Sequence, residues 1–157
     1  MRQIVIDADG CPVTRLAVRI AKEKTIPCTI VCDTSHVFDI PEANVITVEK
    51  GADSADFRIV NLLKKGDIVI TQDYGLAAMC LARGAFVLNQ DGRLYTEENI
   101  GGLLEIRAVN KKSRMTRHRI PHIPKRDADQ NRIFETELRK LLEQTEIIPG
   151  AVPTTGH

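Results

Sequence analysis

The chain has 157 residues, 43% of them hydrophobic and 27% charged, with a net charge of +1. This composition is typical of a single globular domain large enough for its own core, and it argues against a disordered chain. No apolar run approaches the length that spans a bilayer, and no targeting segment precedes the first strand-like residues, so we expect a cytoplasmic protein without a membrane partner.

The first predicted element is a strand over residues 4–6, which is followed at once by Asp7 and Asp9. Gly10 permits a sharp turn there, and Pro12 suits the first position of the helix that follows. In open parallel sheets, ligands bind at the carboxyl ends of the strands. Asp7 and Asp9 are therefore predicted to lie where ligands bind in proteins of this class.

Alternation along a strand would send Asp7 and Asp9 to the same side, with Ala8 opposite. Two close carboxylates repel each other unless both are solvated or a cation neutralises them, and Mg²⁺ prefers such oxygen ligands. The alternative is that one carboxylate caps the helix and the other is solvated. Cys11 lies near the same helix terminus, but the acidic neighbours oppose a reactive thiolate there.

Strand-like and helix-like segments then alternate along the chain, which predicts a parallel sheet with helices on both faces. Reduced and mostly buried thiols are expected, because none of the four cysteines forms a C-x-x-C pair. Helices are predicted over residues 13–24, 54–63 and 76–83, and strands over residues 28–32, 45–48, 67–71 and 85–88.

The last third of the chain is less regular. Residues 96–109 are predicted to be partly helical, with an interruption at Gly101 and Gly102, whereas residues 128–143 form a clear amphipathic helix. Residues 146–157 are expected to be a flexible tail. We therefore expect one domain over residues 1–145. The apolar stripe of the amphipathic helix consists of Ile133, Phe134, Leu138, Leu141 and Leu142.

A basic connecting segment spans residues 107–126, with eight of the 22 Lys and Arg residues and no Asp or Glu. The rest of the chain is consequently acidic. The segment is either a solvated or protein-docking strip or a surface that neutralises a nucleic-acid backbone. The candidate nucleic-acid-binding residues are Lys111, Lys112, Arg114, Arg117 and Arg119.

Three further acidic residues are predicted to join the same edge of the sheet. Asp53 and Asp56 open one helix, and Asp73 follows a strand. Each would be a plausible helix cap by itself. Capping does not require so many acids at one edge, however, so together they indicate a Mg²⁺ or Mn²⁺ site for phosphoryl transfer.

Three motifs resemble the YaiI/YqxD family of uncharacterised bacterial proteins. They are Asp-Ala-Asp-Gly-Cys-Pro-Val at residues 7–13, Gly-Ala-Asp-Ser-Ala-Asp at 51–56 and Gly-Asp-Ile-Val-Ile-Thr-Gln-Asp at 66–73. The resemblance runs to about Leu142 and implies a PIN-like fold, a three-layer α/β/α sandwich with a mostly parallel sheet. By the same resemblance, the metal-binding and catalytic residues are Asp7, Asp9, Asp53, Asp56 and Asp73.

Many PIN-like proteins are metal-dependent ribonucleases, so the leading hypothesis is a nuclease that uses an activated water on a phosphodiester, with RNA as the expected partner. A second hypothesis is a haloacid-dehalogenase-like phosphatase, with Asp7 as nucleophile, Asp9 as acid and base, and Thr34 or Ser35 as a second hydroxyl. A third is a non-catalytic RNA- or ribosome-associated protein whose acids are caps or a structural metal site.

Overall fold

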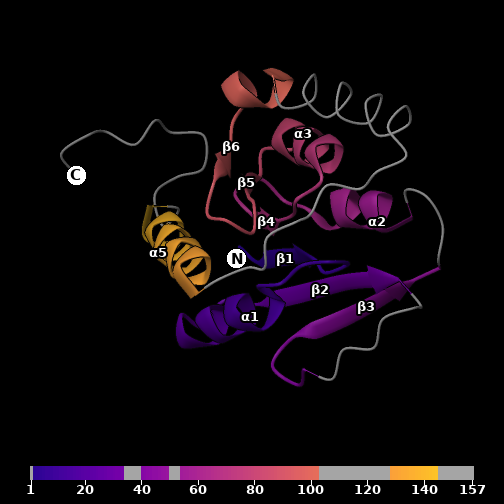
Figure 1. Ribbon diagram of the computed structural model, residues 1–157. Coiled ribbons are helices and arrows are strands. Elements are labelled where there is room, and N and C mark those ends of the chain that lie inside the picture. Colours follow the sequence, from indigo (N-terminus) through magenta and orange to yellow (C-terminus); the bar gives the residue numbers. More distant parts are fainter. Residues whose placement is uncertain (1, 34–39, 50–53, 103–127, 145–157) are drawn as a thin grey trace, which may run out of the picture.

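A twisted sheet forms the middle layer of the protein (Figure 1). The computed structural model describes residues 2–33, 40–49, 54–102 and 128–144. Within these ranges the strands lie in the order β3-β2-β1-β4-β5-β6, all parallel except β6, which is antiparallel to β5. The strands are β1 (Ile4–Asp7), β2 (Cys28–Asp33), β3 (Asn44–Val48), β4 (Ile68–Ile70), β5 (Phe86–Leu88) and β6 (Leu94–Tyr95).

Helices cover both faces of this sheet, as Figure 1 shows. On one face lie α1 (Thr14–Glu23) and α5 (Ala128–Gln144), and on the other lie α2 (Ser54–Leu62) and α3 (Tyr74–Ala82). Residues 97–102 are also helical. The predicted α/β/α architecture with a mostly parallel sheet is therefore confirmed. None of the helices in the described residues is long and apolar enough to cross a bilayer.

The central strands are apolar on both faces because each face is covered by helices. In β1, Ile4 and Ile6 belong to the cluster beneath α1 and α5, whereas Val5 belongs to the cluster beneath α2 and α3. The alternation continues past the strand, since Ala8 is buried in the first cluster. It therefore assigns Asp7 to the face of Val5, toward α2 and α3.

The strand order places a topological switch point in the middle of the sheet. The chain builds outward from β1 to β2 and β3, crosses the sheet by way of α2, and continues outward on the other side from β4 to β5 and β6. The carboxyl ends of β1 and β4 therefore diverge into separate connections, and open α/β sheets bind their ligands at such a point.

Asp67 is a buried structural residue at the opposite edge of the sheet. Its side chain is 1% exposed and accepts hydrogen bonds from the backbone N of Lys64 at 2.8 Å, and from the backbone N and Nε2 of Gln3 at 3.2 and 3.1 Å. The carboxylate of Asp67 therefore ties the start of β1 to the connection before β4.

Three local expectations differ from the structure. Pro12 was expected at the first helical position, but α1 begins at Thr14, with Val13 at the N-cap. The antiparallel strand β6 was not expected, because a two-residue strand leaves little periodicity to read. Gly101 and Gly102 were expected to interrupt a helix, but both are helical.

The predicted C-terminal helix is confirmed with one change in its buried face. Phe134 and Leu138 are fully buried, whereas Ile133 is 51% exposed. Leu141 and Leu142 complete the buried stripe. Adjacent residues of a helix point about 100° apart, and at this position Phe134 points into the core and Ile133 toward solvent. The predicted basic segment at 107–126 and the tail at 146–157 lie outside the described residues.

The cysteines are free thiols, as expected for a reduced protein. Cys28, Cys32 and Cys80 are buried, and Cys11 is half-buried. Burial raises the pKa of Cys28 and of Cys80 to about 12, so these two side chains stay protonated and act as small apolar groups in the core.

Candidate functional site

Acidic side chains from three elements meet at the carboxyl ends of β1 and β4. Asp7 is the last residue of β1, Asp56 lies in the first turn of α2, and Asp73 is the N-cap of α3. Asp7 is close enough to the other two that, beside the larger effect of burial, the charges of Asp56 and Asp73 both raise its pKa. The topology thus assembles carboxylates that are far apart in the sequence.

The Thr71 hydroxyl joins two of these acidic residues. Its Oγ1 donates to Oδ2 of Asp7 at 2.8 Å and accepts from the backbone N of Asp73 at 3.0 Å. A hydroxyl has one proton, and an N–H group can only donate, so the Thr71 proton must be directed at Asp7. Thr71 is itself 1% exposed, which fixes this arrangement within the packed protein.

Asp7 has the perturbed acidity that is typical of functional carboxyl groups. Burial is the main cause that raises its pKa from 3.8 to about 6; the hydrogen bond from Thr71 opposes this rise, and the charges of Asp56, Asp9 and Asp73 add to it. Negative charge therefore accumulates here at neutral pH at a cost in free energy, which a bound cation would relieve.

We expect Thr71→Val to raise the pKa of Asp7 above about 6, because the hydrogen bond that favours the ionised form is lost. The carbon-13 shift of the Asp7 carboxyl group, followed by NMR as a function of pH, measures this directly. Thr71→Ser keeps the hydroxyl and should leave the titration near that of wild type. A Val variant that titrates at or below the wild-type pKa would contradict the assigned hydrogen bond.

Asp9 lies on the loop after β1 and faces the end of β2. One of its carboxylate oxygens accepts from the backbone N of Asp33 at 3.4 Å. The same loop contains Gly10 at a φ of 73°, and Nε2 of Gln72 donates to the Gly10 carbonyl oxygen at 3.1 Å. A Cβ at Gly10 would lie 3.1 Å from that nitrogen. The loops after β1 and β4 are therefore tied together.

Asp73 performs the capping role that the sequence left open. Its Oδ1 accepts from the backbone N of Gly75 at 2.9 Å and of Leu76 at 3.2 Å. The cap satisfies two of the four N–H groups that begin a helix without partners. Asp73 therefore caps α3 and also lies at the acidic edge. Its capping role does not exclude it from the site.

Of the five acids expected at this edge, Asp53 lies outside the described residues, and the other four lie at the carboxyl ends of the strands or at the helix that faces them. The basic residues of the segment 107–126, and Thr34 and Ser35 of the phosphatase hypothesis, also lie outside. The sequence interpretation missed Asp33, Thr71 and Gln72. Asp33 is the last residue of β2, as Asp7 is of β1, and Thr71 directly follows β4; these positions at strand ends could have identified them.

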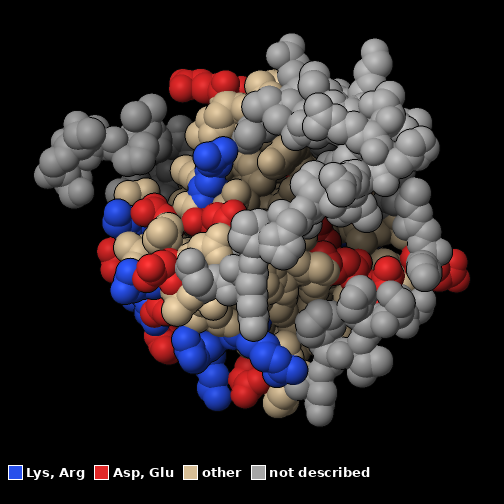
Figure 2. Space-filling view, viewed as in Figure 1, with Lys and Arg blue, Asp and Glu red and all other residues tan. Residues whose placement is uncertain are grey.

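The donor chemistry of this edge fits Mg²⁺ or Mn²⁺, which favour carboxylate oxygens. Figure 2 shows acidic side chains in the right half of the view, near where β2 ends in Figure 1, whereas most of the Lys and Arg side chains coloured in that view lie over α1 and α5. In the described ranges, no three Asp, Glu, His or Cys side chains are close enough to hold one ion as placed. The described acidic residues at this edge are therefore of the right type and in the right place for Mg²⁺ or Mn²⁺, but their side chains are not already arranged as a metal site.

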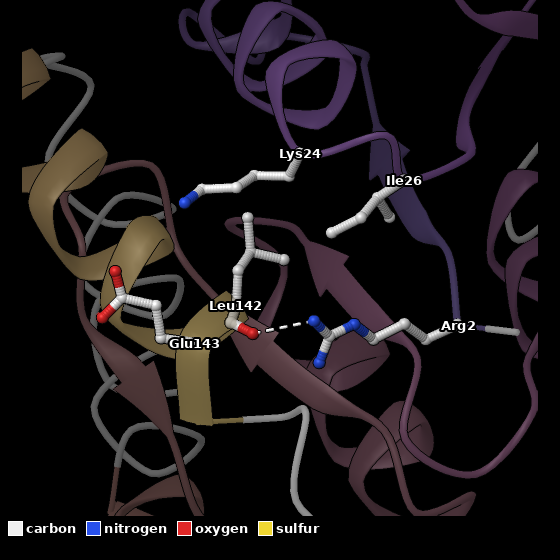
Figure 3. Close-up of a pocket in the computed structure, with 5 residues that line it drawn as sticks. All are labelled: Arg2, Lys24, Ile26, Leu142 and Glu143. Carbon is white, nitrogen blue, oxygen red and sulfur yellow. Dashed lines mark hydrogen bonds between the residues drawn. The ribbon is translucent and has the colours of Figure 1, made fainter.

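A small cavity of about 70 Å³ lies elsewhere, beside the C-terminal end of α5 (Figure 3). Nη2 of Arg2 donates to the carbonyl oxygen of Leu142 at 2.8 Å, which supplies a cation to the negative end of the helix dipole. This arrangement serves the helix terminus. The cavity is lined by Arg2, Lys24, Ile26, Leu142 and Glu143.

The fold and the site define an α/β/α protein with a carboxylate-rich edge at its switch point. Residues 5–144 match the model of the family described as "Uncharacterized BCR, YaiI/YqxD family", and the chain belongs to this family. The resemblance expected from the three motifs is therefore confirmed.

Similar proteins cover most of the chain. A UPF0178 protein of Clostridium acetobutylicum is 37% identical, covering 92% of this chain and 99% of its own. One from Enterococcus faecalis is 44% identical, covering 91% and 99%. Among solved structures, Rae1 (YacP) from Bacillus subtilis (W164L mutant) is similar with a TM-score of 0.42 and 15% identity, covering 91% of this chain and 99% of its own. At that TM-score, the likeness says nothing about activity.

Proposed function

We propose that the protein is a metal-dependent nuclease of the PIN-like type that hydrolyses phosphodiester bonds in RNA. The observation that supports this best is the state of Asp7. It stands at the switch point of the sheet, oriented by Thr71, and burial, with a smaller contribution from three neighbouring carboxylates, raises its pKa. A site that gathers negative charge in this way is suited to divalent cations and, through them, to phosphate.

Each side chain has a distinct task in this proposal. Asp7 offers a carboxylate whose orientation is set by the Thr71 hydroxyl, and Asp9 and Asp56 add negative charge from the neighbouring loop and from α2. Asp73 adds a further carboxylate and holds the start of α3. Bound Mg²⁺ or Mn²⁺ would neutralise phosphate oxygens and increase the acidity of water. Asp53 is proposed to join them by the family motif.

The acidic edge repels a nucleic-acid backbone unless cations offset its charge. The basic segment 107–126 has the composition to do so, since each Lys or Arg that contacts a phosphate strengthens binding in a salt-dependent way. We therefore assign the contact with the RNA backbone to Lys111, Lys112, Arg114, Arg117 and Arg119.

Calorimetric titration with Mn²⁺ tests the proposal. We expect wild type to bind the ion, and Asp7→Asn to bind it at least about tenfold more weakly because a charged ligand becomes neutral. Glu97→Gln removes one negative charge from an exposed residue and should bind as wild type does. Wild type should also cleave a labelled single-stranded RNA with Mn²⁺ and lose the activity in EDTA.

Two other experimental results would favour a different function over the proposed nuclease. A phosphoryl group trapped covalently on Asp7, with turnover of simple phosphate monoesters, would establish the phosphatase. RNA binding without turnover that survives Asp7→Asn combined with Asp73→Asn would establish a binding protein. Asn keeps an oxygen for the α3 cap, so the second variant tests charge and not the helix terminus.

A further inference from the structure

An exposed aromatic side chain lies beside the acidic edge. Phe57 is 61% exposed, the highest value among the large apolar side chains of the described residues. It belongs to the first turn of α2 and follows Asp56, whose charge raises the pKa of Asp7. Helical side chains lean toward the N-terminus of their helix, here toward the strand ends where the acids lie.

Arg58 adds a cation to the same surface. Its side chain is exposed, and within the described residues its guanidinium has no hydrogen bond or ion pair. Consecutive residues of α2 therefore carry a carboxylate near Asp7, an exposed aromatic ring and a cation that no described residue engages. Proteins that bind single-stranded nucleic acids stack the bases on aromatic side chains and track the backbone with cations.

We propose that Phe57 and Arg58 bind one unpaired nucleotide next to the acidic edge, with the base stacked on the Phe57 ring and a phosphate paired with Arg58. The inference rests on the proposed function, because it supplies the substrate that the carboxylates would act on. It also narrows that substrate to single-stranded nucleic acid, since a base within a duplex has no free face for the ring. Stacking accepts any base, so no sequence preference is expected from this contact.

A second copy of the chain is a poorer occupant for this surface. A stable dimer needs about 800 Å² from each partner, whereas one aromatic side chain supplies roughly 150–250 Å². The neighbours of Phe57 on the exposed side of α2 are polar or charged, with Arg58 beside it and Asn61 one turn on. A single flat ring among polar groups matches a nucleobase better than a protein face.

Anisotropy of a fluorescein-labelled oligouridine measures the contact, in Mg²⁺ and separately in EDTA. We expect Phe57→Ala to weaken binding roughly 5- to 100-fold, the range for loss of one stacked base, and Phe57→Trp to retain it. Arg58→Gln should lower the slope of log affinity against log salt by about 0.7, the value for one phosphate contact on a single strand. Ile133→Ala, an exposed apolar residue on the other face, is the matched control.

The outcomes separate this inference from the nuclease. Equal binding by wild type and Phe57→Ala, or equal binding of the single strand and its duplex, overturns the inference even when RNA is cleaved. Loss of binding in Phe57→Ala without metal-dependent cleavage supports the inference and removes the nuclease. A wild-type dimer that Phe57→Ala converts to monomer, with oligouridine binding unchanged, overturns it in favour of a protein interface.

Discussion

Asp7→Asn is expected to stabilise the metal-free protein at pH 7 by about 1–3 kcal/mol. The pKa of Asp7 is raised to about 6 in the folded protein, from 3.8. The neutral form therefore favours folding below about pH 4, and this contribution is lost as the pH rises through about 6. At about 1.4 kcal/mol per pKa unit the upper limit is about 3 kcal/mol, which partial solvent access reduces. Asn retains an oxygen that can accept from Thr71.

Urea unfolding of both proteins at a series of pH values measures this difference. It should be small near pH 4, grow through about pH 6 and then level off. Glu97→Gln should show no such growth. Mn²⁺ should then reduce or reverse this difference, because an ion stabilises the folded protein that it binds, and wild type is expected to bind it at least about tenfold more tightly than Asp7→Asn. A variant that is less stable than wild type at pH 7, in the absence of metal, would show that the ionised Asp7 is not strained.

Phe134→Ala is expected to cost about 3–5 kcal/mol of folding free energy. Phe134 is fully buried between α5 and the sheet, in the cluster that includes β1 and α1 residues. Removing the ring leaves a cavity that this rigid layer cannot close. For a domain of this size, the loss corresponds to a fall in Tm of roughly 6–20 °C, which calorimetry would measure.

The neighbouring residue provides a matched control on the same helix. Ile133 is 51% exposed, so Ile133→Ala should change stability by no more than about 1 kcal/mol. Similar losses for the two variants would mean that α5 does not pack as described. A large difference would establish α5, which follows the basic segment in the chain, as part of the core and not an appended element.

Much of the fold could be predicted because each central strand is a short apolar run with a turn residue after it. Ile4–Ile6 and Ile68–Ile70 illustrate this, and the helices between strands have amphipathic periodicity. The missed features have little periodicity of their own. The strand β6 is two residues long and is defined by pairing with β5, and Ile133 is exposed because its neighbour Phe134 takes the buried position.

The candidate site was only partly predictable. Asp7, Asp9, Asp56 and Asp73 could be named because each stands at a strand end or a helix start, and position along the chain is enough for that. The hydrogen bonds from Thr71 to Asp7 and from Gln72 to Gly10 could not be predicted. They span 64 and 62 residues, so they depend on which strands become neighbours. The same limit applies to the buried Asp67, because its hydrogen bonds with Gln3 span 64 residues.

The pairing of β1 with β4 also has a consequence for biosynthesis. Asp7 emerges from the ribosome early, but its partner Thr71 is 64 residues further along, and β4 must add to the sheet before the two meet. Such distant contacts form late, because the intervening chain must first be ordered. A nascent chain would therefore carry Asp7 without the hydroxyl that orients it. The carboxylates of Asp7 and Asp73 would come together at one edge only after nearly half of the polypeptide has been translated.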